Sequence, residues 1–298
     1  MPDTENRGDG RRQFRSLNRG LSILKLFTAE TTQLSAPDIV GRVEMHKTTT
    51  YRMLAELADQ GFLARNEMTG KYSIGPVMYL LGSLYQQSDS LQVAAAPVVT
   101  LLSDLTGEAC SLAILSEDVV VHVLLGETCH EVGWDRFIGM TLPAHTCALG
   151  KSLLSALTEE EIDRLYPEET LRSRTPHTVT SRSALKAELA QVRATGVAID
   201  DEGCVPGVAG RGSPVLDHRG TTVAAFSVSV PVFRFPDSLH PLYASAARLS
   251  AQLVSYRLGF RSRDISITSL EQLQSWWLKA KAEHVQGEGA ASTVDQVD

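Results

Sequence analysis

The sequence predicts an α+β protein with two folded domains. Its 298 residues suffice for two domains, since one domain commonly holds roughly 100 to 200 residues. Residues 34–75 show two short helical segments and a hairpin pattern, whereas residues 91–258 show the order helix, strands, helices, strands, helix. That second order is typical of an antiparallel sheet covered by helices and lacks the strict alternation of a doubly wound sheet. The two regions therefore predict a small N-terminal domain and a larger C-terminal one.

The N-terminal domain is expected to begin with an amphipathic helix over residues 16–29 and to continue as a helix-turn-helix. Ser35 is a good N-cap for a helix that runs to about Val43, and residues 44–46 form a three-residue turn. A second helix is expected from Lys47 to about Gln60. Its buried stripe, at helical spacing, comprises Thr50, Leu54, Leu57 and Gly61. The hairpin that follows, with Gly70 in its turn, makes this a winged helix-turn-helix.

The outer face of the second helix carries small hydroxyls, one aromatic ring and one arginine. Such a face can enter the major groove and reach base edges, while basic groups beside it contact phosphates. The residues expected to read bases are Thr48, Thr49, Tyr51 and Arg52, and those expected to hold phosphates are Lys47, Arg65 and Lys71. The alternative is a packed subdomain that never touches DNA.

Charge is divided unevenly along the chain. The whole chain has a net charge of −7, but residues 1–75 hold 11 Lys and Arg against 9 Asp and Glu, which leaves −9 for the remainder. This division fits a DNA-reading head on an acidic body. No apolar run approaches the length of a membrane span, and the N-terminus lacks a signal-peptide core. The four scattered cysteines suit a reducing compartment, so we expect a cytoplasmic protein without a membrane partner.

The C-terminal domain is predicted from alternating helix and strand signals. A helix that contains Pro97 and ends at Gly107 precedes strand patterns over residues 110–116, 119–126 and 130–139. A small-residue loop between Pro143 and Gly150 leads into further helices, and residues 197–203 form a strand. Residues 204–213 are expected to form a glycine-rich loop before a hairpin and a closing helix over about 237–258. Small-molecule sensor domains of the GAF type have this architecture, so a GAF-like α/β fold with an antiparallel sheet is expected; the analogy concerns the fold and not a ligand.

The predicted boundaries divide the chain into five parts. A disordered tail covers residues 1–14, the winged helix-turn-helix 15–76, a linker helix 77–91, the effector domain 92–260, and a C-terminal helix with a disordered end 261–298. The linker helix is strongly apolar on one face, which favours dimerisation over packing on its own domain. The pair Trp276 and Trp277 is costly to leave in water, so we expect its helix to dock on another surface.

Three segments together resemble the IclR family of bacterial transcription regulators. They are "HKTTTYRMLAELADQGFLARNEMTGKYSIG", "GMTLPAHTCALGKSLLSAL" and "GVAIDDEG" with the later "SPVLDHRGTTVAAFSVSVP". The resemblance covers roughly residues 14 to 260. It implies a homodimer or dimer of dimers on a palindromic double-stranded DNA operator, repression or activation, and a small-molecule effector such as an organic acid or an aromatic compound.

The resemblance also implies an effector pocket. Matching positions here are Ala148, Leu149, Asp200, Ser227 and Ser229, and we add Arg211 as a candidate anchor for a carboxylate. Ala148 and Leu149 are larger than the residues often found in the family, and Gly210 stands where a cysteine is common. The two serines alternate on one strand and so face the same way.

Catalytic and metal sites are weakly supported. His145 and Cys147, with Cys204 elsewhere, lack the paired spacing of a zinc site, so we expect no metal and no cofactor. His122 fits a core histidine better than a ligand, and "GVAGRG" does not follow the phosphate-loop pattern. The alternative function that remains is a small-molecule hydrolase or metalloenzyme with an N-terminal association module.

Overall fold

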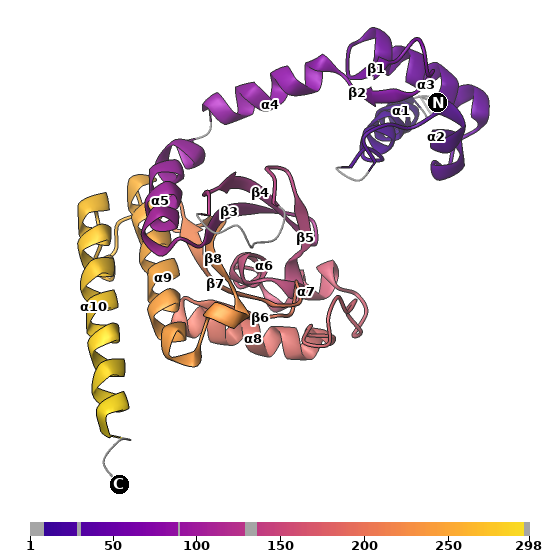
Figure 1. Ribbon diagram of the computed structural model, residues 1–298. Coiled ribbons are helices and arrows are strands. Elements are labelled where there is room, and N and C mark those ends of the chain that lie inside the picture. The colour runs from indigo at the N-terminus through magenta and orange to yellow at the C-terminus, as the bar shows by residue number, and fades with distance from the viewer. Residues whose placement is uncertain (1–8, 29–30, 89, 129–135, 295–298) are drawn as a thin grey trace, which may run out of the picture. The chain divides into compact units, whose positions relative to one another are not determined.

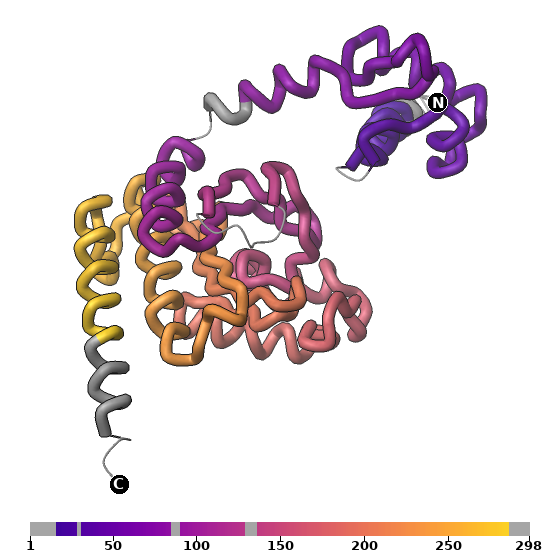
Figure 2. The backbone as a smooth tube through the Cα atoms, viewed as in Figure 1, coloured from indigo at the N-terminus to yellow at the C-terminus, as the bar shows by residue number. Residues whose placement is uncertain are grey.

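The computed structural model describes residues 9–28, 31–88, 90–128 and 136–294. The chain divides into two compact units, residues 1–89 and 90–298, and Figures 1 and 2 trace them from indigo to yellow. Among the described residues, no helix is both long enough and apolar enough to cross a membrane.

The first unit holds four helices and a small two-stranded sheet within its described residues. Its elements are α1 (Asp9–Leu24), α2 (Ala36–Arg42), α3 (Lys47–Asp59), β1 (Leu63–Arg65), β2 (Tyr72–Ile74) and α4 (Pro76–Ser88). Ile23, Ile39, Leu54 and Leu63 meet in its core, each almost fully buried. The predicted helix-turn-helix with a wing is therefore the fold of this unit.

Local sequence signals fix the ends of these elements. Ser35 caps α2 through a capping box, in which its hydroxyl accepts from the Asp38 amide at 3.3 Å and the Asp38 carboxylate accepts from the Ser35 amide at 3.1 Å. Gly61 ends α3 with φ of 73°, and Gly70 turns the hairpin with φ of 68°. Both angles favour glycine, so the helix stop and the turn follow from the sequence.

The second unit is built on a six-stranded antiparallel sheet (Figure 1). Its strands are β3 (Ala109–Ser116), β4 (Val119–Leu125), β5 (Thr141–Pro143), β6 (Ala198–Asp201), β7 (Val208–Leu216) and β8 (Thr222–Pro231), in the spatial order β5-β4-β3-β8-β7-β6. The central pair β3 and β8 matches Ser111 with Ser227 and Ala109 with Ser229. Ser227 and Ser229, two residues apart on β8, therefore lie on the same face of the sheet.

Helices cover both faces of this sheet. One face packs on α5 (Ser90–Thr106), α9 (His240–Arg257) and α10 (Leu270–Val294), through residues such as Leu102, Phe226 and Leu253. The other face packs on α6 (Ala148–Leu154), with α7 (Glu159–Leu165) and α8 (Arg182–Thr195) beyond it. Short 3₁₀ turns, at Ala144–Thr146, Val232–Arg234 and Asp237–Leu239, connect these elements.

The C-terminal helix belongs to the second unit. Trp277 is fully buried, its indole Nε1 donates to the Leu105 carbonyl at 3.2 Å, and its ring meets Tyr243 edge-on at 5.5 Å. The expected docking of this helix is thus explained by α5 and α9, which receive Trp277, while Trp276 is only partly buried.

Several element limits differ from the sequence prediction. Helix α1 begins at Asp9 and α10 continues to Val294, so helix occupies parts of both ends that were predicted to be disordered; residues 1–8 and 295–298 lie outside the described residues. The strand predicted over 130–139 falls largely on undescribed residues, and the strand of this region is β5. The glycine-rich stretch is not a loop from Val208 onward but strand β7, because its small residues pack beneath α6.

Candidate nucleic-acid interface and ligand pocket

The outer face of α3 is not covered by other described residues of the first unit. Lys47, Thr48, Tyr51 and Arg52 are exposed, with Tyr51 at 41%, and Thr49 is half-buried. On the inner side Thr50 and Leu54 are fully buried, so the helix has one packed face and one open face, as its spacing predicts. The Lys47 ammonium lies 6.0 Å from the centre of the Tyr51 ring, which keeps a cation at the N-terminal end of the open face.

The wing adds two exposed cations. Arg65 is the last residue of β1, and Lys71 directly precedes β2. The Arg65 guanidinium lies 5.8 Å from the centre of the Tyr72 ring. Asn66 fixes the turn, since its side-chain oxygen accepts from the amides of Met68 and Thr69 at 3.0 Å each. The hairpin therefore holds its basic side chains on an ordered frame.

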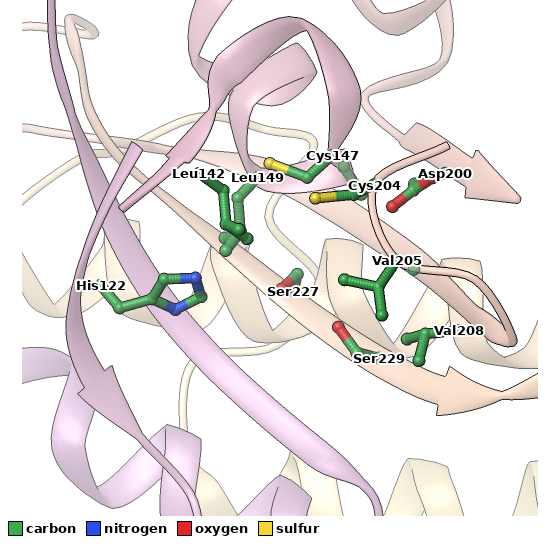
Figure 3. A pocket seen from close by; sticks show the side chains of 12 residues that line it. His122, Leu142, Cys147, Leu149, Asp200, Cys204, Val205, Val208, Ser227 and Ser229 are labelled. Carbon is green, nitrogen blue, oxygen red and sulfur yellow. The ribbon is translucent and has the colours of Figure 1, made fainter. Parts of the chain in front are cut away.

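The second unit contains a small pocket between the α6 face of the sheet and the β6–β7 loop (Figure 3). It holds about 360 Å³ of space not filled by atoms, its mouth included. Five of the residues predicted to bind an effector line it, namely Ala148, Leu149, Asp200, Ser227 and Ser229. They come from α6, β6 and β8, so three elements distant in sequence meet here.

The floor of the pocket is the alternating face of β8. Ser227 is buried and its hydroxyl lies 3.3 Å from that of Ser111 on β3, while Ser229 is half-buried nearer the mouth. Gly210 of β7 lies beside them, and a Cβ built on it would meet the Ala148 side chain at 3.4 Å. Hydroxyl groups on an otherwise apolar floor can orient a polar ligand.

Asp200 is the acidic residue of the pocket wall. Its carboxylate accepts from the Gly203 amide at 2.7 Å. Burial raises the pKa of Asp200 to about 6, against the opposing influence of Lys151 and of that hydrogen bond. A carboxyl with this pKa carries its proton in a substantial fraction of molecules near pH 6, and in that form it can donate a hydrogen bond.

Arg211 does not belong to the pocket, which corrects the prediction made for it. It lies on β7 next to Gly210, and neighbouring residues on a strand face opposite sides. Its Nη1 donates to the Asp201 carboxylate at 2.7 Å and to the Gly210 carbonyl at 2.9 Å, and its guanidinium lies 5.1 Å from the centre of the Phe235 ring. An ion pair between the buried Arg211 and the exposed Asp201 carboxylate thus takes the place of the expected ligand anchor.

Three further polar residues line the pocket that were not predicted to bind a ligand. They are His122 on β4, Cys147 at the N-cap of α6 and Cys204 in the β6–β7 loop. Figure 3 shows His122 facing the two cysteines across the pocket. Burial lowers the pKa of His122 to about 4. Strand alternation alone could have placed His122 on one face of β4, but it does not say that this face meets α6.

His145 is a structural residue. It is buried, its Nε2 lies 2.9 Å from the Arg172 carbonyl, and its ring meets Tyr166 edge-on. Within the described ranges, no group of three or more His, Cys, Asp or Glu side chains is arranged to hold a metal ion.

Comparison with protein families matches both units. The description "Bacterial transcriptional regulator IclR C-terminal" matches residues 84–256, and "IclR helix-turn-helix domain" matches residues 16–67. The chain is 32% identical to the HTH-type transcriptional regulator BhcR of Paracoccus denitrificans over 83% of its length and 88% of that protein. It is 28% identical to the transcriptional repressor IclR of Escherichia coli over 76% of its length and 83% of that protein.

Solved structures share the fold. A putative IclR transcriptional regulator from Silicibacter superposes with a TM-score of 0.77 at 24% identity, covering 85% of this chain and all of that one. An IclR homolog from Microbacterium hydrocarbonoxydans, solved in complex with 4-hydroxybenzoate, superposes with a TM-score of 0.69 at 24% identity, covering 82% of this chain and 98% of that one.

Proposed function

The chain belongs to the IclR family of bacterial transcriptional regulators and is a DNA-binding regulator, and we propose that α3 reads its operator while the pocket of the second unit binds a small effector. The observation that carries the first part is the open face of α3. Tyr51 and Arg52 project from the face opposite the buried Thr50 and Leu54, so they can reach base edges in a major groove without unpacking the head.

Each basic and hydroxyl group has a distinct role in this proposal. Thr48, Tyr51 and Arg52 contact bases, because they are exposed on the open face, and the half-buried Thr49 contacts bases from its edge. Lys47 at the start of α3, together with Arg65 and Lys71 on the wing, holds phosphates on either side of the groove. Phosphate contacts set the position of the head on DNA, and base contacts set the sequence that it selects.

The test is a gel-shift titration of full-length protein on its own promoter region. Arg52→Ala should weaken binding by about 1–3 kcal/mol and relax sequence preference if Arg52 bonds a guanine. Lys71→Ala should weaken binding to all sequences and reduce the salt slope by about one. Arg257→Ala removes an exposed arginine from the second unit and serves as the charge-matched control. Unchanged affinity and preference in Arg52→Ala would remove that residue from the interface.

We propose that the effector is a small organic acid or aromatic compound held by Ala148, Leu149, Asp200, Ser227 and Ser229. Only about 20 Å³ inside the pocket is open to a water-sized molecule, so a compound of few atoms fits best and its entry requires side chains of the pocket wall to move. Its apolar walls suit a ring or short chain, and the hydroxyls with a protonated Asp200 can donate to a carboxylate. The fold relative solved with 4-hydroxybenzoate makes that compound a reasonable first probe.

A thermal-shift screen of small acids and aromatic compounds tests this pocket. A compound that binds only the folded chain stabilises it by about 2.7 kcal/mol at 100 times its Kd. Ser229→Ala, which removes the hydroxyl and adds no bulk, should abolish the shift produced by a compound that wild type binds. A shift that survives both Ser229→Ala and Ser227→Ala would place the ligand elsewhere.

We also propose that the apolar face of α4 joins two copies on a palindromic operator. Tyr79, Leu80, Leu81 and Leu84 are each at least half exposed, and a C2 operator needs two heads. Light scattering of Leu80→Glu with Leu84→Glu should show a smaller assembly than wild type. The named relatives are regulators and repressors, which favours regulation over the hydrolase alternative.

A further inference from the structure

Cys147 and Cys204 contact each other in the wall of the pocket. The thiol of each is the largest influence on the pKa of the other, and Figure 3 shows their sulfur atoms close to one another in the pocket wall. Cys147 is the N-cap of α6, and Cys204 lies in the β6–β7 loop. Both are more than nine-tenths buried and both are free thiols. Two cysteines far apart in sequence are thus brought into contact by the fold.

The backbone around both thiols is firmly held. The Cys147 sulfur accepts from the Gly150 amide at 3.4 Å. On the other side, Arg174 Nε donates to the Cys204 carbonyl at 3.1 Å, and the Thr178 hydroxyl donates to the neighbouring Gly203 carbonyl at 2.6 Å. These bonds tie the loop to residues 174–178, so the two sulfur atoms stay opposed without a rearrangement of the chain.

A second cavity also reaches Cys204. It holds about 570 Å³ of empty space, open solvent included, and is lined by Arg172, Ser173, Arg174, Cys204, Val205 and Pro206. Cys204 and Val205 line both this cavity and the ligand pocket. A small polar reagent can therefore reach Cys204 through a vestibule of basic and hydroxyl groups. Cys110, by contrast, is packed in the apolar core under α5.

The two thiols differ in acidity. Interaction with the Cys147 thiol lowers the pKa of Cys204, and Arg174 acts in the same direction. The same interaction, together with burial, raises the pKa of Cys147. Burial raises the pKa of Cys110 to about 12. Since the thiolate is the reactive form, Cys204 is the attacking sulfur of the pair and Cys147 is the partner that resolves the product.

We propose that Cys147 and Cys204 form a dithiol site that hydroperoxides oxidise to a disulfide. The Cys204 thiolate attacks one peroxide oxygen, the O–O bond breaks, and the hydroxide that leaves takes up a proton to become water. The resulting sulfenic acid is attacked by the Cys147 sulfur as it loses its proton, the S–O bond breaks, and a second water leaves. Two thiols and one hydrogen peroxide thus give one disulfide and two waters.

The bridge would join the start of α6 to the β6–β7 loop, across the wall that Ala148 and Asp200 share. Its formation depends only on the two thiols and their access. Its effect on ligand binding rests on the proposed function of the pocket, because a covalent tie between α6 and the loop restricts how the pocket opens. Detection of the disulfide itself therefore tests the proposal without DNA or effector.

The test treats full-length protein with a tenfold excess of hydrogen peroxide, blocks remaining thiols with N-ethylmaleimide and maps peptides by mass spectrometry without reduction. We expect a cross-linked peptide pair containing Cys147 and Cys204 that dithiothreitol separates. The variants Cys110→Ser and Cys129→Ser are the matched controls and should leave the bridge intact. Full alkylation of Cys147 and Cys204 after peroxide treatment would overturn the proposal, as would their pairing with other cysteines instead.

Single variants test the order of the two steps. In Cys147→Ser, the sulfenic acid at Cys204 has no resolving thiol and should be trapped by dimedone. In Cys204→Ser, Cys147 should remain unlabelled and be recovered as a free thiol. Dimedone labelling of Cys147 in Cys204→Ser at the rate seen for Cys204 would refute the assignment of Cys204 as the attacking sulfur. Gel-shift affinity of each variant is scored separately, so failure of the dithiol chemistry leaves the DNA-binding proposal untouched.

Discussion

Asp200 and His122 titrate in the same pocket and act on stability in opposite directions. Burial raises the pKa of Asp200 from its ordinary 3.8 to about 6, so the folded chain keeps a proton that the unfolded chain releases. Stability therefore falls as the pH rises from about 4 to about 6 and stays lower above that range. At 1.36 kcal/mol per pKa unit, the loss is about 3 kcal/mol. The groups that influence this carboxyl are Lys151, Asp201 and the amides of Gly203 and Cys204.

His122 has the reverse effect. Burial lowers its pKa from 6.5 to about 4, and Arg136 acts in the same direction, so the unfolded chain binds a proton that the folded chain excludes. Stability contributed by the neutral ring is present above pH 6.5 and is lost as the pH falls through about 4. The magnitude is again about 3 kcal/mol. In wild type the two effects nearly cancel between pH 4 and 6.5.

Single variants should uncover each effect. Asp200→Asn keeps an oxygen to accept from the Gly203 amide but cannot ionise, so its stability relative to wild type should rise by about 3 kcal/mol between pH 4 and 6. His122→Phe cannot bind a proton, so its stability relative to wild type should fall by a similar amount between pH 4 and 6.5. A packing change that alters stability by the same amount at every pH does not affect how the difference between variant and wild type changes with pH.

Urea unfolding followed by tryptophan fluorescence measures this, because all three tryptophans fall within residues 90–298 and so report on the second unit. Curves at half-unit pH steps from 3.5 to 7.5 give the difference between variant and wild type at each pH. If the difference for Asp200→Asn stays constant within about 1 kcal/mol across this range, a value well below the slope expected from its pKa, the burial argument for this carboxyl is wrong.

The remaining predictions concern packing and capping. A Cβ at Gly212 would lie 2.8 Å from the Ala148 carbonyl oxygen, so Gly212→Ala should lower the free energy of urea unfolding by about 3 kcal/mol. At Gly210 the nearest neighbour of an added Cβ is a side-chain carbon at 3.4 Å. Gly210→Ala should therefore lower that free energy by less than about 1 kcal/mol while narrowing the pocket. Trp277→Ala should lose about 3–5 kcal/mol through its cavity and the lost bond to Leu105; the partly buried Trp276 is its control, and equal losses would refute the docking argument. Ser35→Ala should lower the stability of the first unit by about 1 kcal/mol, measured by amide hydrogen exchange.

The first unit was predictable because its signals are local. Ser35 with Asp38 defines one helix start, Gly61 one helix end and Gly70 the hairpin turn. The helical spacing of Thr50 and Leu54 separates the buried side of α3 from its open side. Each of these signals acts over a few residues, so the sequence specifies them without knowledge of the rest of the chain.

The pocket was predictable only in part because it depends on which strands meet which helix. The family resemblance predicted that Asp200, Ser227 and Ser229 would line the pocket. Arg211 does not line it, because the alternation of side chains along β7 places Arg211 on the opposite face of the sheet. His122 and Cys204 reach the pocket through the order β5-β4-β3-β8-β7-β6 and a loop held by side chains of residues 174–178. Neither contact leaves a local pattern, so residue spacing alone could not assign them.

The sheet offers a physical route from the pocket to the start of the second unit. Ser227 lines the pocket, and its hydroxyl lies 3.3 Å from that of its partner Ser111 on β3. Leu112 and Val228 beside them pack on the opposite face, in the same core as Leu102 of α5. That helix is also bonded to β3, since the Cys110 amide donates to the Ser103 hydroxyl at 3.3 Å, and a Cβ on Gly126 would overlap the same hydroxyl. A ligand that shifts β3 or β8 must therefore move or strain α5, whose first residue follows α4 after Asp89 alone. For regulation, the ligand must favour one arrangement of α5 over another, because equal affinity for both would change nothing.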